Sequence, residues 1–185
     1  MALTPSTMPE LGIAAPNFQL PDVVSGRTIS LQTFSDKKAL LVMFICRHCP
    51  YVQHVQEELA RLGRDYAGKS IGIVAISAND AENYPNDAPA NLKAMAQQLQ
   101  FNFPYCYDAT QATAKAFQAA CTPDFFLFDR ARHLVYRGQL DDSRPGNNQP
   151  VTGAHLRSAI DAVLAGQPIT VAQRPSLGCN IKWKP

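Results

Sequence analysis

The sequence lacks a charge excess of either sign and lacks an apolar run long enough to cross a membrane. Its 185 residues include 17 Lys and Arg against 15 Asp and Glu, which gives a formal net charge of +2. The charges are dispersed, so we expect neither a nucleic-acid partner nor a membrane partner. The longest apolar run, Ala39 to Cys46, is much shorter than the roughly 20 residues that span a bilayer.

The chain also lacks a secretory signal and a cysteine framework of the secreted kind. Residues 1–15 show neither a charged start nor an apolar core region. Five cysteines are an odd number, and they are widely spread: Cys46, Cys49, Cys106, Cys121 and Cys179. This pattern predicts a cytoplasmic protein in which a close cysteine pair is catalytic or metal-binding and does not form a structural disulfide.

Apolar runs alternate with helical stripes along the chain. Strands are expected at 28–31, 39–45, 71–76 and 101–105, a hairpin at 125–136, and helices at 52–66, 90–99, 111–120 and 153–164. Such alternation predicts a mixed sheet covered on both faces. Residues 1–14 are expected to be a flexible lead-in, 15–166 one domain, and 167–185 a tail packed on its surface, with Ile181 and Trp183 as anchors.

The segment Cys46-Arg47-His48-Cys49 follows a buried strand and precedes a helix. A helix N-terminus lowers the pKa of a nearby thiol, and a thiolate is the attacking species. We therefore expect Cys46 to attack, Cys49 to act as the shielded resolving thiol, and Arg47 and His48 to activate the pair. Positive charge favours the reduced form, so the disulfide should be oxidising, and Cys-x-His-Cys is similar to the motif of the bacterial oxidant DsbA.

Two other interpretations of this motif stay open. A single Cys-x-x-Cys pair can be half of a zinc site, which His48 and His54 could complete, although the chain has no second such pair. The two cysteines could also be structural residues without chemistry.

Further stretches of the sequence resemble one family. They are Ala15 to Asp22, Gly26, Ser30-Leu31, Phe34, Lys38 to Phe44, Phe44 to Val52, Phe103 to Tyr105, Asp108, Cys121 to Phe126, Tyr136 to Gly138, Asp141-Asp142 and Gly178 to Lys184. On these residues the chain resembles the AhpC/TSA-redoxin branch of the thioredoxin-like superfamily. The resemblance covers nearly the whole chain from Ala15, and Cys46 to Val52 is its most specific part.

The resemblance implies an α/β thioredoxin-like fold: a central mixed β-sheet flanked by helices on both faces, with an N-terminal β-hairpin extension. It also implies a cis bond before Pro123, which would leave the backbone of Thr122 free to pair with an extended thiol substrate. Two features depart from the family. The peroxiredoxin threonine is replaced by Met43 or Cys46, depending on the register, which argues against efficient peroxidase activity. Leu40 stands where thioredoxins have a buried aspartate.

Proton transfer would then fall to His48, Glu57 or Glu58. Cys179 is a candidate third redox thiol, whereas Cys106 and Cys121 are expected to pack in the core. Arg137 with Asp141 and Asp142 is expected to be structural, and His133 and His155 to face solvent.

The sequence thus predicts a thiol:disulfide oxidoreductase without cofactor or metal, acting on protein or low-molecular-weight thiols and disulfides with a thiol reductant. A peroxiredoxin-like thiol peroxidase is the second prediction, with Cys46 attacking peroxide. A thiolate metal carrier is the third.

Overall fold

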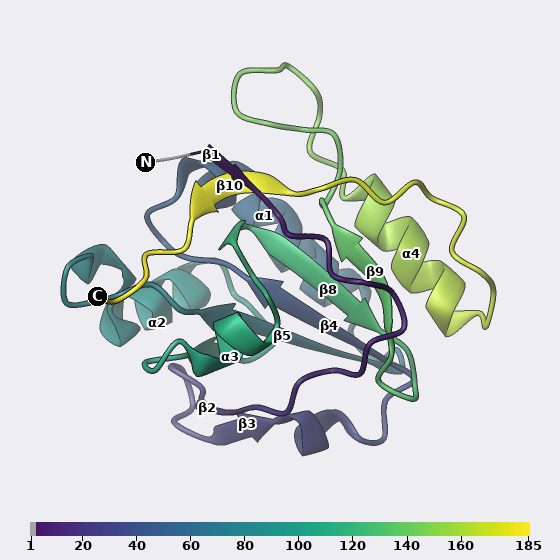
Figure 1. The fold of residues 1–185 in the computed structure, drawn as a ribbon, viewed down its shortest axis with the longest axis horizontal. Coiled ribbons are helices and arrows are strands. Elements are labelled where there is room, and N and C mark those ends of the chain that lie inside the picture. Colours follow the sequence, from purple (N-terminus) through teal and green to yellow (C-terminus); the bar gives the residue numbers. More distant parts are fainter. Residues whose placement is uncertain (1–2) are drawn as a thin grey trace.

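A five-stranded sheet forms the centre of the computed structural model, which describes residues 3–185 (Figure 1). Its strand order is β6-β5-β4-β8-β9. The strands are β4 (Ala39–Phe44), β5 (Ile71–Ser77), β6 (Tyr105–Tyr107), β8 (Asp124–Phe128) and β9 (Leu134–Gly138). β4 pairs in parallel with β5 and antiparallel with β8, so the sheet is mixed, as expected.

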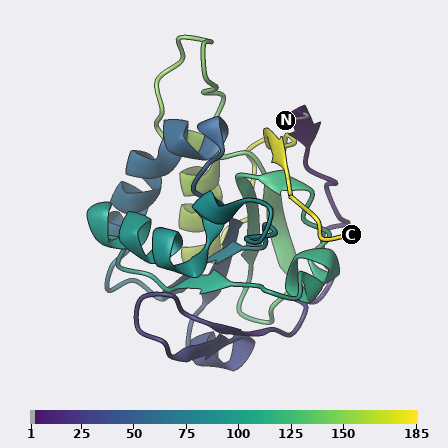
Figure 2. The same cartoon turned by 90° about the vertical axis from the view of Figure 1, so that its left-hand side faces the viewer.

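Alternate residues of β4 point into two separate cores, which is why this strand is apolar throughout. Leu41 and Met43 join one core, and Leu40 and Val42 join the other. The first core lies under three helices, α1 (Pro50–Asp65), α2 (Pro89–Gln98) and α4 (Ala154–Leu164). Figure 2 shows these helices on one side of the sheet.

The opposite face is covered by smaller elements. They are α3 (Ala112–Ala116), the short helix η1 (Leu31–Phe34) and a hairpin of β2 (Gln19–Pro21) and β3 (Thr28–Ser30). Phe117 lies at the centre of this core, with its ring edge against those of Phe126 and Phe128. The prediction of a thioredoxin-like sheet with helices on both faces and an N-terminal hairpin is confirmed.

One strand prediction is wrong. The strand expected at 101–105 begins at Tyr105 and ends at Tyr107. The Pro104 nitrogen has no hydrogen to donate to a ladder, and the rings of Phe101 and Phe103 stack on each other at 4.6 Å between centroids. Packing of these rings before the strand replaces pairing within it.

The two ends of the chain lie side by side in a second small sheet. β1 (Leu3–Pro5) and β7 (Cys121–Thr122) both pair antiparallel with β10 (Leu177–Asn180). A flexible lead-in is therefore wrong for residues 3–14, while Met1 and Ala2 lie outside the described residues. Ile181 is buried as expected, but Trp183 is 40% exposed and is not a core anchor.

Between residues 3 and 185, none of the helices combines the length and the apolar character needed to cross a membrane. A short helix, η2 (Pro85–Asp87), interrupts the loop expected between β5 and α2. It carries Asp87, which is fully buried. Because β4 and β5 run in parallel, this loop and the Cys46 segment emerge at the same edge of the sheet.

Candidate active site

The cysteine motif lies between the end of β4 at Phe44 and the start of α1 at Pro50. Cys49 is the N-cap residue of α1, and Pro50 occupies the first helical position. Proline suits that position because its fixed φ matches the helix and its missing N–H would have had no partner there. The motif lies at a strand-to-helix junction, as predicted, but Cys49 and not Cys46 is the residue at the helix N-terminus, because the helix starts at Pro50, four residues after Cys46.

Three sulfur atoms gather around Thr122. Cys46 Sγ lies 3.2 Å from Thr122 Oγ1, and Cys49 Sγ lies 3.2 Å from the carbonyl oxygen of Thr122. Cys49 Sγ also lies 2.8 Å from Cys179 Sγ. All three thiols are free, and all three are buried. The structure therefore brings together Cys46 and Cys49, the predicted pair, with Cys179, the candidate third thiol.

The negative charge of this cluster belongs on Cys49. A hydrogen bond from Cys46 lowers the pKa of the Cys49 thiol to about 5; burial opposes this shift, and the Cys179 thiol and the backbone N–H groups of Val52 and Cys179 add to it. The Thr122 carbonyl accepts from Cys49 only while that thiol is protonated. A thiolate at a helix N-terminus is also favoured by the helix dipole.

Cys46 has the opposite environment. Its hydrogen bond with Cys49, its burial and the negative charge of Asp87 raise the pKa of the Cys46 thiol well above its usual value. The directions of the two pKa shifts therefore favour a thiolate on Cys49 and oppose the one expected on Cys46. The charged group that faces Cys46 is a carboxylate and not the guanidinium of Arg47.

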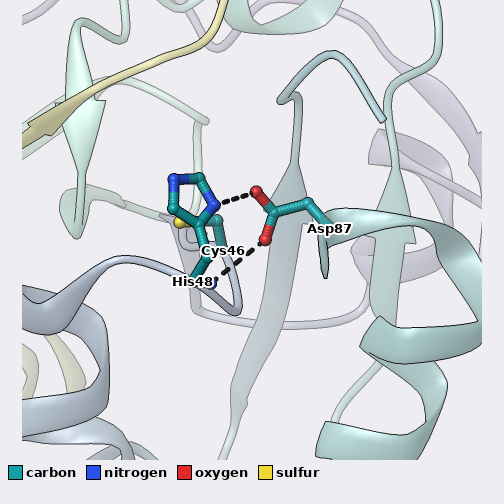
Figure 3. Close-up of side chains that lie close together, drawn as sticks. All are labelled: Cys46, His48 and Asp87. Atoms are coloured by element: carbon teal, nitrogen blue, oxygen red, sulfur yellow. Dashed lines mark hydrogen bonds and ion pairs between the residues drawn. The ribbon is translucent and has the colours of Figure 1, made fainter. Parts of the chain in front are cut away.

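Asp87 is the site residue that the sequence did not reveal. Its Oδ1 accepts the backbone N–H of Arg47 at 2.7 Å and that of His48 at 3.2 Å. Its Oδ2 accepts from Asn79 Nδ2 at 2.8 Å and from the ring Nδ1 of His48 (Figure 3). Asp87 therefore fixes both the backbone and the ring of the Cys46 segment. Nothing in the spacing of Asp87 from the cysteines indicates this contact.

The His48 ring is held on its other side as well. It stacks on Tyr84 at 5.7 Å between centroids. With Nδ1 donating to Asp87, the neutral ring carries its lone pair on Nε2. That Nε2 is buried and has no hydrogen-bond partner among the described residues. A ring nitrogen of His48 lies within 4.8 Å of Cys46 Sγ, so the imidazole is a close neighbour of the Cys46 thiol.

The same three groups, Cys46, His48 and Asp87, are close enough to hold a metal ion. Each Asp87 oxygen, however, already accepts two hydrogen bonds. His54, which could have completed a zinc site, bonds instead to Ser143 Oγ at 2.7 Å. The donor set therefore fits a hydrogen-bonded relay better than a metal site.

The Thr122–Pro123 bond is cis, which confirms that expectation. The expected free edge at Thr122 is absent, however. Cys179 of β10 pairs with Thr122, and Asn180 pairs with Cys121. Thr122 is buried as a result. The tail of the chain occupies the position that was expected to be open to a substrate.

The remaining predicted residues lie outside the cluster. Cys106 and Cys121 are fully buried, and burial is the main reason that the pKa of each thiol is raised. Glu57 is exposed, and Glu58 is paired with Arg61 and Arg157, so neither is free to serve the thiols. His133 faces solvent, whereas His155 is half-buried against Gln139, contrary to expectation.

Arg137 bonds to Pro9 and Gln173 instead of to Asp141 or Asp142. Asp141 accepts the backbone N–H groups of Ser143, Thr152 and Gly153. Both contacts hold the chain in place, as the structural interpretation of these residues predicted.

A polar cleft of about 370 Å³ opens beside the motif. Its lining includes Arg47 and His48 together with Gln53, Gln56, Asn86 and Gln98. Within residues 3–185, the Arg47 guanidinium has neither a hydrogen-bond partner nor an ion-pair partner. Arg47 therefore offers an unpaired positive charge at the rim of the site.

Comparisons with known proteins agree with this architecture. Two solved structures match almost end to end: an uncharacterized conserved protein from Geobacillus kaustophilus (54% identity, 100% of this chain and 98% of that chain, TM-score 0.98) and a hypothetical protein from Sinorhizobium meliloti 1021 (50% identity, 98% of each chain, TM-score 0.96). No curated protein sequence matches.

A more distant structure shares the fold alone. It is a thiol:disulfide interchange protein of the thioredoxin family from Chlorobium tepidum, with 17% identity, 84% of this chain and 99% of that chain covered, and a TM-score of 0.64. The family model that describes the AhpC/TSA family matches residues 11–137, which include the Cys46 motif and Pro123. The chain therefore belongs to the AhpC/TSA family and has a thioredoxin-like fold.

Proposed function

We propose that this protein is a thiol:disulfide oxidoreductase in which Cys46 and Cys49 alternate between a dithiol and a disulfide. The observation that carries the proposal is the position of Cys49 at the N-cap of α1, hydrogen-bonded to the Cys46 thiol. A low-pKa thiolate beside a protonated thiol is the arrangement that thiol–disulfide exchange requires.

The reaction follows from the two pKa directions. The Cys49 thiolate attacks one sulfur of a substrate disulfide, so a Cys49–substrate disulfide forms and the other substrate sulfur leaves as a thiolate that takes a proton. Cys46 then attacks Cys49 and passes its own proton to His48. The Cys46–Cys49 disulfide forms and the second substrate thiol leaves. The protein loses two electrons and the substrate gains them.

The reverse reaction, in which the protein oxidises thiols, is the favoured direction. Stabilising the Cys49 thiolate stabilises the reduced protein, which makes its disulfide the stronger oxidant. Stabilisation comes from Cys46, Val52 and Cys179. The activating role expected for Arg47 is replaced by a role at the rim, where its charge can contact a substrate carboxylate.

Partners in this proposal are thiols and disulfides of proteins or small molecules, with a thiol reductant as the electron donor. The polar cleft at Arg47 and His48 suits a small peptide disulfide that bears carboxylates, such as glutathione disulfide. Five free cysteines suit a reducing compartment, which supports the cytoplasm as the location.

A thiol peroxidase is the second candidate because Thr122 Oγ1 lies 3.2 Å from Cys46 Sγ. This contact supplies the hydroxyl that the sequence lacks three residues before either cysteine. The raised pKa of Cys46 opposes this function, since peroxide reacts with thiolates. Hydrogen peroxide turnover, measured in parallel with disulfide turnover, separates the two candidates.

The test is steady-state reduction and formation of disulfides, with insulin and with glutathione disulfide as substrates. The wild-type protein should turn over at least one of them, and Cys46→Ser and Cys49→Ser should each abolish that turnover. Cys106→Ser is the matched control, because Cys106 is equally buried but lies in β6. Turnover that survives loss of Cys49, or its absence in the wild-type protein, would contradict the proposal.

A further inference from the structure

The tail of the chain lies against the active site as a β-strand. In Figure 1, the tail (yellow) runs past α4 and enters β10, which lies beside β1; β10 also pairs with β7. Its residue Cys179 pairs with Thr122, the residue immediately before the cis proline. This is the edge at which we expected an extended thiol substrate to pair. The position is instead filled by a segment of the same chain, and that segment carries a thiol.

The thiol of this strand is directed at the active site. Cys179 Sγ lies 2.8 Å from Cys49 Sγ, and the Cys49 thiol also forms a hydrogen bond with the Cys46 thiol. Cys49 is therefore the middle sulfur of three, with a thiol neighbour on each side. Cys179 remains 5% exposed, whereas Cys46 and Cys49 have no exposed surface. Cys179 is thus the outermost member of the cluster.

The approach of β10 is as close as the backbone allows. A Cβ on Gly178 would lie 1.9 Å from the carbonyl oxygen of Thr122, so no larger residue fits here without moving the strand. Ser176 Oγ donates to the carbonyl of Pro123 at 2.6 Å, and Ile181 N donates to Ala120 at 3.1 Å. These contacts on either side of Cys179 fix its place beside Cys49.

The strand is also connected to His48. Lys182 N donates to Asn79 Oδ1 at 2.8 Å, and Asn79 Nδ2 donates to Asp87, which holds the His48 ring. One side chain therefore links the tail to the group that faces Cys46. The tail and the proton relay are parts of one hydrogen-bonded unit.

We propose that Cys179 is a second resolving thiol, and that β10 is a built-in substrate strand through which the Cys46–Cys49 disulfide is exchanged for a Cys49–Cys179 disulfide. The inference rests on the proposed function of the Cys46/Cys49 pair. Cys179, which retains some exposed surface, loses its proton to solvent and attacks Cys49 in the Cys46–Cys49 disulfide. The Cys49–Cys179 bond forms, the Cys46–Cys49 bond breaks, and Cys46 leaves as a thiolate that takes the proton from His48. No electrons are gained or lost in this exchange.

The exchange moves the disulfide from the fully buried Cys46–Cys49 pair to a pair that includes Cys179, which is 5% exposed. A small thiol reductant then attacks Cys179, forming a mixed disulfide and releasing Cys49 as a thiolate. A second reductant thiol attacks the mixed disulfide, so that Cys179 is restored and the reductant becomes a disulfide. Cys49 is the better leaving group of the pair because its thiol has the lower pKa, about 5 against about 12 for Cys179.

The test uses the Cys46→Ser protein, which retains Cys49 and Cys179. After reaction with glutathione disulfide and acid quenching, mass spectrometry of the unreduced digest should show a peptide that joins Cys49 to Cys179. Glutathione on Cys49 should be displaced about tenfold or more faster than in Cys46→Ser/Cys179→Ser, because the internal thiol is held in place. Cys46→Ser/Cys121→Ser is the matched control and should behave like Cys46→Ser.

Persistent glutathione on Cys49 in the Cys46→Ser protein, with no joined peptide, would overturn the inference. If the variant does not fold, the wild-type protein serves: partial oxidation should give both the Cys46–Cys49 and the Cys49–Cys179 peptides, and only the first in Cys179→Ser. Failure of the proposed function is a separate result. There, the wild-type protein would turn over no disulfide even though the joined peptide forms.

Discussion

His48 donates both its backbone N–H and its ring Nδ1 to the carboxylate of Asp87. This double contact sets the direction of the imidazole and leaves Nε2 free, on a ring that reaches within 4.8 Å of Cys46 Sγ. A carboxylate that orients an imidazole beside a thiol is a proton-transfer arrangement. Asp87 therefore acts through His48, as a positioning residue.

The first prediction concerns Asp87→Asn. An asparagine keeps the size of the side chain but removes its charge, so His48 loses the partner that favours its proton-accepting tautomer. We expect resolution by Cys46 to slow by about tenfold to a hundredfold and its pH dependence to shift. Stopped-flow measurement across pH separates this from a structural effect. The control Glu82→Gln, an exposed carboxylate on the same loop, should leave the profile unchanged.

The second prediction concerns the identity of the thiolate. Ultraviolet titration of the reduced protein should show a thiolate whose midpoint lies near the lowered pKa of Cys49, about 5. The signal should vanish in Cys49→Ser. It should persist in Cys46→Ser, because the serine hydroxyl can still donate a hydrogen bond to the Cys49 thiolate. In Cys46→Ala, where that donor is missing, the midpoint should shift to higher pH. If the low-pH titration were lost in Cys46→Ser but retained in Cys49→Ser, the roles assigned to the two thiols would be reversed.

The third prediction concerns stability against pH. The pKa of Cys49 is lowered from 9.0 to about 5 in the folded state. A lowered pKa stabilises the fold fully above the unfolded value and loses that effect as pH falls through the folded value. The free energy of unfolding of the reduced protein should thus rise between pH 5 and pH 9. Urea titrations should show a smaller rise for Cys49→Ser; equal slopes would contradict the assignment.

The fourth prediction concerns Gly178→Ala. The new Cβ would meet the Thr122 carbonyl at 1.9 Å and Pro123 Cδ at 3.2 Å. We expect a loss of about 1–3 kcal/mol in unfolding free energy and less Cys49–Cys179 disulfide on oxidation, because β10 must move away. Leu177→Ala changes a half-exposed residue of the same strand and should preserve that disulfide. Equal yields in the two variants would show that close seating of β10 is unimportant.

Much of the fold could be predicted because local signals and the global fold agree. The run from Ala39 to Phe44 is apolar at every position, which is what a strand buried on both faces requires. The cysteine pair follows that strand, so its place at a strand-to-helix junction was visible too. The exact helix start depends on Pro50, which is favoured as the first helical residue and so makes Cys49 the N-cap.

The rest of the site depends on contacts between distant residues. Asp87 lies 39 positions from His48, and Cys179 lies 130 positions from Cys49. No spacing rule joins residues so far apart. The loop that contains Asp87 is polar and contains prolines, which is typical of a surface segment, whereas the Asp87 side chain is fully buried. The tail offered no periodic signal, because β10 is a four-residue strand.

The fifth prediction concerns the disulfide between Cys46 and Cys49, which we expect to be reversible, with the reduced dithiol as the favoured form. The protein is equilibrated in glutathione buffers of graded potential and acid-quenched, and its free thiols are counted by mass spectrometry. We expect a two-electron transition, joining Cys46 to Cys49, at a potential less negative than the roughly −270 mV of thioredoxin. A midpoint as reducing as that of thioredoxin, or no disulfide between these two cysteines, would contradict it.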